Sequence, residues 1–257
     1  MIAFHTDLDN TLIFSYRHDI GTRKRCVELY QGREVSFVTE RTAELLKRLP
    51  EEIVLIPTTT RMEEQYRRID LGIGTPAYAL VCNGGVLLVD GQEEEGWYRE
   101  SMELVAECKE ELARAEGLLR RDPDRSFEVR NIRELFLFTK SEKPELSAGR
   151  LRRALDLGKM EVFTNGCKVY VLPKRLNKGE ALRRFRRRFS PELVLAAGDS
   201  AFDVPMLEAA DGGFAPEALG RGRVSGGQVR FLGPEGIFSE LMLGEVYRAA
   251  GKIPPLG

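Results

Sequence analysis

The sequence predicts an α/β protein in which a core built around a parallel sheet is interrupted by a smaller α+β domain. Toward both ends of the chain, short apolar runs alternate with segments of helical periodicity, a pattern typical of a parallel sheet covered by helices. In the middle, strand-like runs come in pairs joined by local turns, which favours an antiparallel sheet. We therefore expect the core at residues 1–87 and 173–257, and the inserted domain at residues 88–172.

The first half of the core alternates between strands and helices. MIAFHTD (1–7) and EIVLIPTTT (52–60) are apolar runs that predict buried strands. Between them, VTERTAELLKRLP (38–50) has the periodicity of an amphipathic helix, with a threonine in position to cap it. MEEQYRRIDLG (62–72) predicts a second helix closed by glycine, and AYALVCNGG (77–85) a third strand that ends in a glycine-containing turn.

The inserted domain and the second half of the core follow in the same way. In the inserted domain we expect helices at 101–121 and 145–158, and two strands, MEVFTN (160–165) and KVYVLP (168–173), separated by a tight turn. The core then resumes with a helix at 177–189, a strand at 193–199 and a helix at 204–211.

The composition favours a globular protein that is not directed to nucleic acid or membranes. Hydrophobic residues make up 42% of the chain and charged residues 31%, and 39 basic residues nearly balance 40 acidic ones. No window approaches the roughly 20 apolar residues of a membrane span. The N-terminus shows no secretory signal, and the four cysteines are widely spaced, so we expect a cytoplasmic protein with reduced thiols.

One basic stretch, RRFRRRF at 183–189, invites a nucleic-acid interpretation. The apolar residues Ala181, Leu182, Phe185 and Phe189 fall near helical spacing and leave the arginines on the opposite face. A solvated helix face explains this pattern better than a binding surface, and we expect no nucleic-acid partner.

Two carboxylates stand close together at the end of the first expected strand. Asp7 and Asp9 repel each other, and a fold gains nothing from that repulsion. Either they lie in a solvated turn, or a cation and a reaction require them. The second explanation gains weight because PTTTR, CNGG and GDSAFD end other strands, and the carboxyl ends of parallel strands meet at one edge.

The side chains expected at this edge suit phosphoryl transfer. Clustered carboxylates form a hard site of the kind that Mg²⁺ prefers. A carboxylate also acts as a nucleophile and forms an aspartyl-phosphate that water then hydrolyses. A nearby hydroxyl and a lysine stabilise the charge of the transferring group.

These segments resemble the four motifs of the haloacid dehalogenase-like superfamily. DLDNTL resembles the first motif, PTTTR the second, LPKRLNKGEAL the lysine-bearing third and GDSAFDVPML the acidic fourth. The order and spacing agree, and the motifs span nearly the whole chain outside the insertion. The insertion, with CNGG and NKGEAL, resembles the Cof-like and sucrose-phosphatase-like branch, which implies a Rossmann-like core and a type-two α+β cap.

The resemblance implies roles for the catalytic residues. Asp7 would be the nucleophile, and Asp9 would protonate the leaving oxygen and then deprotonate the hydrolytic water. Lys178 would balance charge between the nucleophile and the phosphate. Mg²⁺ would be held by Asp7, Asp199 and the main-chain carbonyl of Asp9, with Asp203 supporting the metal or Lys178.

The resemblance also implies the residues that contact the substrate. Thr59 would bind the phosphoryl group, with Thr58 and Thr60 as rivals, and Arg61 matches an arginine of the second motif. Asn83 and Gly84 form a turn, which explains them about as well as a role near the substrate does.

Two positions refine or disturb the comparison. Ion pumps of this superfamily usually carry threonine where this chain has Asp9, and an acid there favours fast hydrolysis or mutase chemistry. The branch usually has asparagine where this chain has Phe202, which affects the fine positioning of the fourth-motif loop.

We therefore expect a Mg²⁺-dependent phosphatase that acts on a small phosphorylated metabolite, with a sugar phosphate favoured by the resemblance. The alternatives are a phosphomutase of the phosphomannomutase type and a non-catalytic protein that senses a metabolite. We expect a monomer or a small homo-oligomer.

Overall fold

The computed structural model describes residues 1–225 and 228–255. By their contacts, the residues fall into two compact units. The core unit comprises Met1–Glu94 and Asn177–Gly257, and the inserted unit comprises Glu95–Leu176. The two junctions lie a few residues beyond those expected from the sequence.

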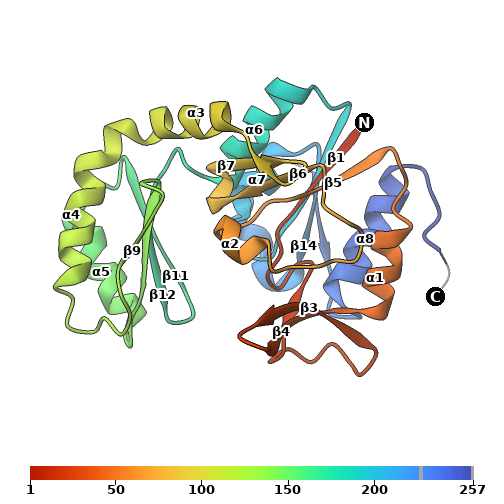
Figure 1. Cartoon of the computed structure of the whole chain (residues 1–257), viewed down its shortest axis with the longest axis horizontal. Helices are drawn as coiled ribbons and strands as arrows, with labels where there is room; N and C mark the ends of the chain where they lie inside the picture. The colour runs from red at the N-terminus through yellow and green to blue at the C-terminus, as the bar shows by residue number, and fades with distance from the viewer. Residues whose placement is uncertain (226–227, 256–257) are drawn as a thin grey trace. The chain divides into compact units, whose positions relative to one another are not determined.

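The core unit is built on a sheet of five strands, all parallel to their neighbours, in the order β15-β14-β13-β1-β5 (Figure 1). The strands are β1 (Ile2–Thr6), β5 (Ile53–Pro57), β13 (Leu193–Ala197), β14 (Gly212–Pro216) and β15 (Val229–Leu232). The chain adds β5 on one side of β1 and β13 on the other, so the strand order reverses at β1. Open α/β sheets bind ligands beyond the carboxyl ends of the strands at such a reversal.

Helices cover both faces of this sheet, as the alternating pattern predicted. The helices are α1 (Glu40–Lys47), α6 (Lys178–Phe189), α7 (Val204–Ala209) and α8 (Phe238–Ala249). Phe4 on β1 belongs to the apolar cluster that contains residues of α1 and α8. Its neighbour His5 points to the other face, where its ring meets Phe185 of α6 edge-on at 5.0 Å.

An antiparallel hairpin between β1 and α1 is absent from the sequence-based prediction. It consists of β3 (Lys24–Tyr30) and β4 (Arg33–Thr39), with the short β2 (Phe14–Ser15) paired to β4. Its turn has positive φ at both Gln31 (51°) and Gly32 (75°), which matches the right-handed twist of a hairpin. Phe14, Ile20 and Phe37 form a small core beneath it.

Two expectations for the core unit are wrong in detail. The third expected strand, β6 (Tyr78–Val81), does not join the parallel sheet, because it pairs antiparallel with β7 (Val86–Val89), which in turn pairs with β8 (Gln92–Glu93). A single parallel bridge between Thr58 and Leu80 links it to the end of β5. The helix expected at 62–72 is only α2 (Glu63–Tyr66), since the chain turns toward Gly72 with φ of 72°.

The inserted unit is α+β, and the paired strands confirm the expected antiparallel sheet. Its order is β11-β12-β10-β9, from β9 (Arg130–Ile132), β10 (Phe136–Lys140), β11 (Met160–Asn165) and β12 (Lys168–Pro173). Residues of α4 (Lys109–Arg120) and α5 (Pro144–Ala154) share one apolar cluster with residues of β10, β11 and β12. The helix expected at 101–121 is divided into α3 (Glu95–Val105) and α4 by a 3₁₀ turn at Ala106–Cys108.

The arginines of α6 are engaged in ion pairs within the core unit. Arg183 and Arg187 pair with Glu180, Arg186 pairs with Asp211 and Arg188 with Glu94. Arg184 departs from the expected solvated face, because it is 6% exposed. In the part of the chain that the structure describes, no helix is long and apolar enough to cross a bilayer.

Candidate active site

The first two motifs meet where β1 ends between its two neighbours. The amide of Asp7 donates to the carbonyl of Ala197 at 2.9 Å, and the amide of Thr58 donates to the carbonyl of Thr6 at 2.7 Å. These bonds continue the parallel ladders one residue past the strands. Asp7 is therefore held beside the fourth-motif loop that follows β13.

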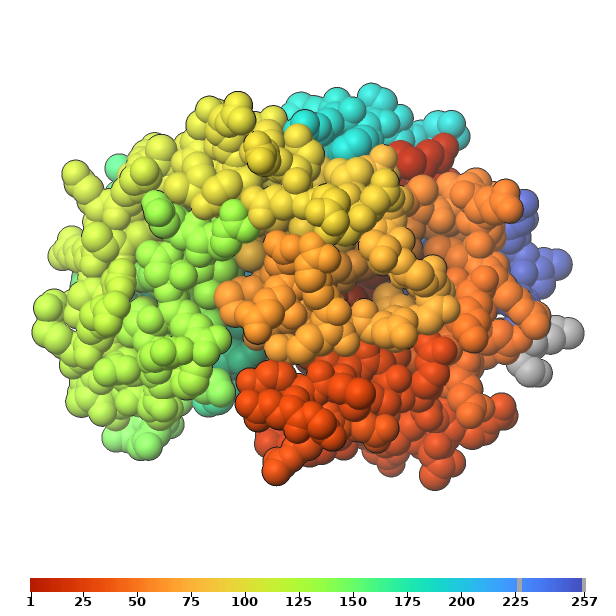
Figure 2. All heavy atoms as spheres, in the orientation of Figure 1, coloured from red at the N-terminus to blue at the C-terminus, as the bar shows by residue number. Residues whose placement is uncertain are grey.

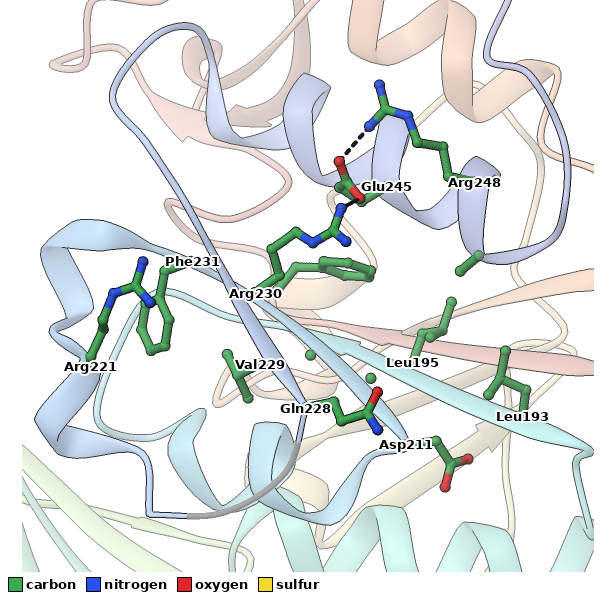
Figure 3. A pocket seen from close by; sticks show the side chains of 14 residues that line it. Leu193, Leu195, Asp211, Arg221, Gln228, Val229, Arg230, Phe231, Glu245 and Arg248 are labelled. Carbon is green, nitrogen blue, oxygen red and sulfur yellow. Dashed lines mark hydrogen bonds and ion pairs between the residues drawn. The ribbon is translucent and has the colours of Figure 1, made fainter.

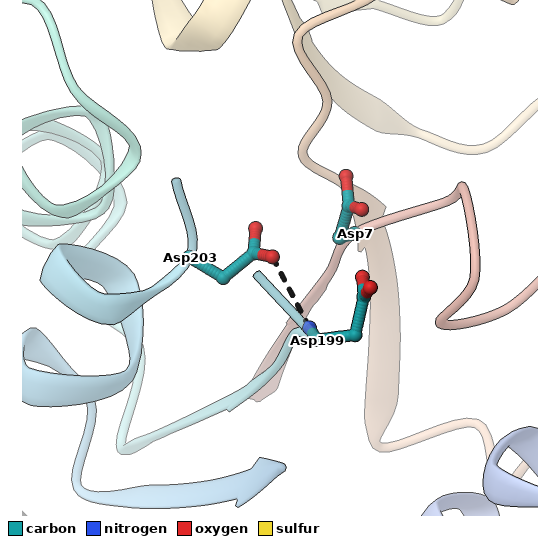
Figure 4. A group of neighbouring side chains, drawn as sticks. All are labelled: Asp7, Asp199 and Asp203. Carbon is teal, nitrogen blue, oxygen red and sulfur yellow. Dashed lines mark hydrogen bonds between the residues drawn. The ribbon is translucent and has the colours of Figure 1, made fainter. Parts of the chain in front are cut away.

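Three carboxylates converge at this point (Figure 4). Asp7, Asp199 and Asp203 each offer an oxygen within 4.8 Å of the others. Asp7 follows β1, Asp199 follows β13 and Asp203 immediately precedes α7. Asp7 is 7% exposed and Asp203 is fully buried, so their charges are largely withdrawn from water.

Lys178 is the cation that the structure places among these carboxylates. Its Nζ donates to Asp7 Oδ1 at 2.6 Å and to Asp203 Oδ1 at 2.5 Å, and its side chain is 1% exposed. Burial alone would lower the pKa of Lys178, but the two carboxylates outweigh burial and raise it. The lysine therefore stays charged at the first residue of α6, where Asn177 caps the helix by accepting from the Glu180 amide at 2.8 Å.

Both carboxylate oxygens of Asp203 accept hydrogen bonds that position neighbouring groups. Oδ1 receives Lys178, while Oδ2 accepts from the amides of Asp199 at 3.1 Å and Ser200 at 2.9 Å, and from the Ser200 hydroxyl at 2.8 Å. A Cβ on Gly198 would lie 2.2 Å from Asp203 Cβ, so only glycine allows this approach. These contacts make Asp203 a support for the lysine and the loop.

Asp199 and Asp7 are destabilised as anions. Burial, and then repulsion from Asp203, raises the pKa of Asp199 to about 6, although the Thr11 hydroxyl opposes this by donating to its Oδ1 at 2.9 Å. Burial likewise raises the pKa of Asp7 above its usual range, against the attraction of Lys178. Oxygen ligands that repel one another in a buried site fit a small hard cation such as Mg²⁺, which would relieve that repulsion.

Asp9 faces an arginine instead of the lysine. Arg61 Nε and Nη2 donate to the two Asp9 oxygens, both at 2.7 Å, in a bidentate pair. The other side of the guanidinium reaches Glu28 on β3, where Arg61 Nη1 lies 2.9 Å from Oε2. Glu28 is buried and also receives Arg68 at 3.0 Å and the Ser36 hydroxyl at 2.6 Å.

The three threonines of the second motif have different surroundings. Thr58 Oγ1 donates to the Ile56 carbonyl at 3.1 Å and lies 3.1 Å from His5 Nδ1, so it is engaged in the core. Thr59 Oγ1 accepts from the Arg61 amide at 3.1 Å and retains its own hydrogen for donation. Thr60 is half-buried. Which of the three contacts a phosphoryl group stays a prediction.

Asn83 and Gly84 lie in the turn between β6 and β7, which contacts both the second motif and α6. The Asn83 amide donates to the Thr59 carbonyl at 2.9 Å. Gly84 has φ of 85°, and a Cβ there would lie 2.3 Å from Ala181 Cβ. Close packing against α6 thus explains why glycine occupies position 84, and the Asn83 amide is bonded to the loop of Thr59.

Two residues that lie at the site are missing from the set predicted from sequence. Thr11 belongs to the first motif and was visible there, but its contact with Asp199 depends on how two distant loops meet. Glu28 lies on the hairpin that the sequence analysis did not recognise. Alternation along the strand gives no signal for it, because the neighbours Val27 and Glu28 are both buried, at a register shift between β3 and β4.

A pocket in the core unit lies away from the residues of the candidate active site (Figure 3). Its volume is about 800 Å³, and it is lined by the first residues of three strands, Leu193, Gly212 and Val229. Glu245 is paired with Arg230 and Arg248 in its wall. Because Asp7 and Asp199 follow the opposite ends of the strands, this pocket is separate from the candidate site.

Comparison with known proteins gives the same family as the motifs. A model of the haloacid dehalogenase-like hydrolase family matches residues 91–217. A phosphoglycolate phosphatase from Methanopyrus kandleri is 32% identical over 142 residues, which cover 52% of this chain and 56% of that protein. The match thus spans little more than half the length of this relative.

Solved structures with a similar fold cover nearly the whole chain. The sucrose-phosphatase of Synechocystis, solved with sucrose and phosphate, has a TM-score of 0.67 at 17% identity, over 96% of this chain and 97% of that one. A haloacid dehalogenase-like hydrolase from Bacteroides thetaiotaomicron has a TM-score of 0.57 at 17% identity, over 95% and 98% of the two chains. At these identities the likeness concerns the fold.

Proposed function

Because the chain belongs to the haloacid dehalogenase-like superfamily, we propose that it is a Mg²⁺-dependent phosphatase that hydrolyses a small phosphorylated metabolite through an aspartyl-phosphate on Asp7. One observation carries this proposal: the buried carboxylates of Asp7 and Asp203 both pair with buried Lys178, and the carboxylate of Asp199 lies beside them. Such an arrangement is costly for stability and suits a site that must handle a phosphoryl group.

Asp7 is the nucleophile in this proposal. Lys178 holds its Oδ1, and no other described residue donates to its Oδ2, which is free to attack phosphorus. The same ammonium opposes the effect of burial and favours the ionised form that attack requires. Lys178 would also offset charge on the phosphoryl oxygens, while Asp203 keeps it in place.

Asp9 is the acid and base. In the structure both of its oxygens are bonded to Arg61, which stabilises the carboxylate that accepts a proton from the hydrolytic water. To donate a proton to the leaving oxygen, Asp9 must give up one of these two bonds. Arg61 therefore orients the side chain and favours the form needed in the second half of the reaction.

The metal would be held by Asp7, Asp199 and the main-chain carbonyl of Asp9. When bound, Mg²⁺ would neutralise charge on the phosphoryl group and position it. Thr11 fixes Asp199 for this purpose through its hydroxyl. Asp203 has both oxygens engaged by other groups, so we assign it to Lys178 and the loop, not to the metal.

The substrate class rests on the relatives. The phosphoglycolate phosphatase and the sucrose-phosphatase are named for small phosphate monoesters, which supports a small metabolite here. Thr59 or Thr60 would donate to the phosphoryl group, and the Asn83–Gly84 turn holds the Thr59 loop. A sugar phosphate is one member of this class.

Phosphate release from a panel of phosphomonoesters tests the proposal, with Mg²⁺ and with a chelator. We expect release that requires the metal and is lost in Asp7→Asn, while Asp19→Asn, an exposed loop carboxylate, behaves as wild type. Metal-independent release, or release that survives in Asp7→Asn, would refute it. Movement of the phosphoryl group within a substrate without net release would favour a mutase, and binding without turnover a sensor.

A further inference from the structure

The core unit contains a second polar pocket, directly beside Asp9. It has a volume of about 380 Å³, and its lining includes Asp9, Tyr16, Arg17, Tyr30, Arg61 and Arg68. We call it the hairpin pocket, because it is also lined by Glu28 of β3 and by Val35 and Ser36 of β4. The hairpin forms part of the exposed surface of the core unit (orange-red in Figure 2).

The hairpin pocket carries an excess of positive charge. Its lining includes three arginines and two carboxylates. Arg61 is balanced by Asp9 and Glu28, and Arg68 by Glu28. Arg17 has no carboxylate partner among the residues that the structure describes. One guanidinium in this pocket is therefore available for an anion.

Two arginines of the hairpin pocket are held against tyrosine rings. Arg17 lies 5.4 Å from the ring centroid of Tyr16, and its Nε donates to that hydroxyl at 3.1 Å. Arg68 lies 4.6 Å from the ring centroid of Tyr30. Stacking orients each planar guanidinium, and because the Tyr16 oxygen accepts from Arg17, its own hydrogen is left to donate.

We propose that the hairpin pocket binds a second anionic group, a carboxylate or a phosphate, on the leaving group of the substrate. This inference rests on the proposed phosphatase function, in which Asp9 contacts the leaving oxygen. A group attached to that oxygen extends away from phosphorus along the wall that Asp9 and Arg61 form. Arg17 and the Tyr16 hydroxyl then meet its charge with donors suited to a carboxylate or phosphate.

Three esters built on the same two-carbon scaffold distinguish the groups that the hairpin pocket could bind. Hydroxyethyl phosphate is neutral beyond its phosphate, phosphoglycolate adds a carboxylate, and ethylene glycol bisphosphate adds a second phosphate. We expect kcat/KM for at least one anionic ester to exceed that for hydroxyethyl phosphate by about tenfold or more. The better of the two anionic esters identifies which group the pocket prefers.

The residue that creates this preference is tested by Arg17→Gln. We expect the anionic-to-neutral ratio of kcat/KM to fall about tenfold in Arg17→Gln and to recover in part in Arg17→Lys. The matched control is Arg33→Gln, an exposed arginine of the same hairpin that lies outside the pocket lining, in which the ratio should hold.

Three results would overturn the inference. A wild-type ratio near one, or a ratio that Arg17→Gln leaves unchanged while phosphate is still released, would refute the anion site and leave the phosphatase standing. A ratio that falls equally in Arg33→Gln would refute the assignment to Arg17. Absence of release from every ester, from folded protein with Mg²⁺, would instead refute the phosphatase function on which the inference depends.

Discussion

Arg61 links the proposed acid to a buried glutamate that belongs to a different element. Its guanidinium holds Asp9 by two bonds of 2.7 Å and Glu28 by a contact of 2.9 Å. Because Glu28 is 2% exposed and also binds Arg68, its position is fixed. Glu28 is thus a positioning residue for Asp9, acting through Arg61.

The role of Glu28 leads to a kinetic prediction. In Glu28→Gln, Arg61 loses one of its two anionic partners, so the orientation of Asp9 becomes less certain in the transition state. We expect kcat to fall about tenfold with little change in KM, equivalent to ~1.4 kcal/mol of transition-state stabilisation.

Steady-state kinetics of this variant should be compared with Glu34→Gln, an exposed acid of the same hairpin, which should match wild type. An unchanged kcat in Glu28→Gln would show that Glu28 does not position Asp9. A rise in KM alone would indicate that Glu28 contributes to substrate binding instead.

From the sequence alone, the candidate site residues that can be predicted are those in local motifs. Asp7, Asp9, Lys178 and Asp199 were predicted because each lies in a short recognisable pattern at the end of a strand or the start of a helix. Glu28 was missed because only tertiary pairing brings it to Arg61.

The junction of α6 and α7 decides where Lys178 and Asp203 lie. Gly179, the residue after the lysine, packs so closely that a Cβ would stand 2.2 Å from the carbonyl oxygen of Pro205. The helices can approach to this distance only because Gly179 has no side chain. The contact between Lys178 and Asp203 depends on that approach.

We therefore predict that Gly179→Ala destabilises the protein and lowers kcat together. Relieving the clash must move α6 from α7, which typically costs about 1–3 kcal/mol of unfolding free energy for an overpacked site. The matched control is Gly149→Ala in α5, where a Cβ meets nothing closer than 3.7 Å and helix propensity favours alanine.

Denaturant unfolding measures both variants. Gly149→Ala should be neutral or slightly more stable than wild type. Equal stability of Gly179→Ala and wild type would show that the two helices need not be this close.

Strand β1 and helix α6 meet at a buried histidine whose charge state affects stability. Burial, with the nearby Arg186, lowers the pKa of His5 from 6.5 to about 3. The unfolded chain binds this proton more tightly than the folded protein does. The contribution of uncharged His5 to the free energy of unfolding is therefore complete above about pH 6.5 and is lost as the pH falls toward 3. The raised pKa values of Asp7 and Asp199 act in the opposite direction.

Comparison of wild type with His5→Leu isolates the histidine. We expect the difference in unfolding free energy between the two proteins to shift in favour of His5→Leu as the pH is lowered from about 6.5 to about 4. Thermal or urea unfolding across this range measures it. A difference that does not depend on pH would mean that His5 titrates alike in both states.

Elements were predicted best where periodicity and a local turn coincide. The strands at 160–165 and 168–173 agree with β11 and β12, because a two-residue glycine turn separates two apolar runs. The hairpin of β3 and β4 was missed, since its strands carry many charged residues on the solvent side. The strand at 77–85 was expected in the parallel sheet, but no local signal distinguishes that sheet from the hairpin it forms with β7.

Across the whole molecule, the proposed metal site couples ligand binding to stability. Asp7, Asp199 and Asp203 bring three carboxylates within 4.8 Å of one another, and Lys178 is bonded to Asp7 and Asp203. The repulsion destabilises the folded chain, and a bound divalent cation would convert it to attraction.

We predict that Mg²⁺ raises the Tm of the wild-type protein and has no such effect on Asp199→Asn. At a concentration one hundred times Kd, the stabilisation should approach ~2.7 kcal/mol. Asp199→Asn should also be more stable than wild type in the absence of metal, because it removes one of the repelling charges. Scanning calorimetry with and without Mg²⁺ measures both effects, with Asp19→Asn as the control that responds like wild type.

The core-and-insertion plan was visible from the alternation of strands and helices, and the family from four motifs in order. The strand order, with its reversal at β1, comes from pairing between strands far apart in the chain, which no single segment encodes. For the same reason the hairpin pocket and its arginines could not be seen in the sequence.

The central claim is that Asp7 becomes phosphorylated, and trapping the intermediate tests it most directly. Asp9→Asn, which cannot deprotonate the hydrolytic water, should accumulate a phosphoenzyme when mixed with Mg²⁺ and p-nitrophenyl phosphate, whose leaving group departs without needing a proton from Asp9, then quenched in acid. Peptide mass mapping should find one added phosphoryl group, on the peptide that contains Asp7, and none in the double variant Asp7→Asn, Asp9→Asn. A phosphoryl group on another residue, or one that persists in the double variant, would contradict the account.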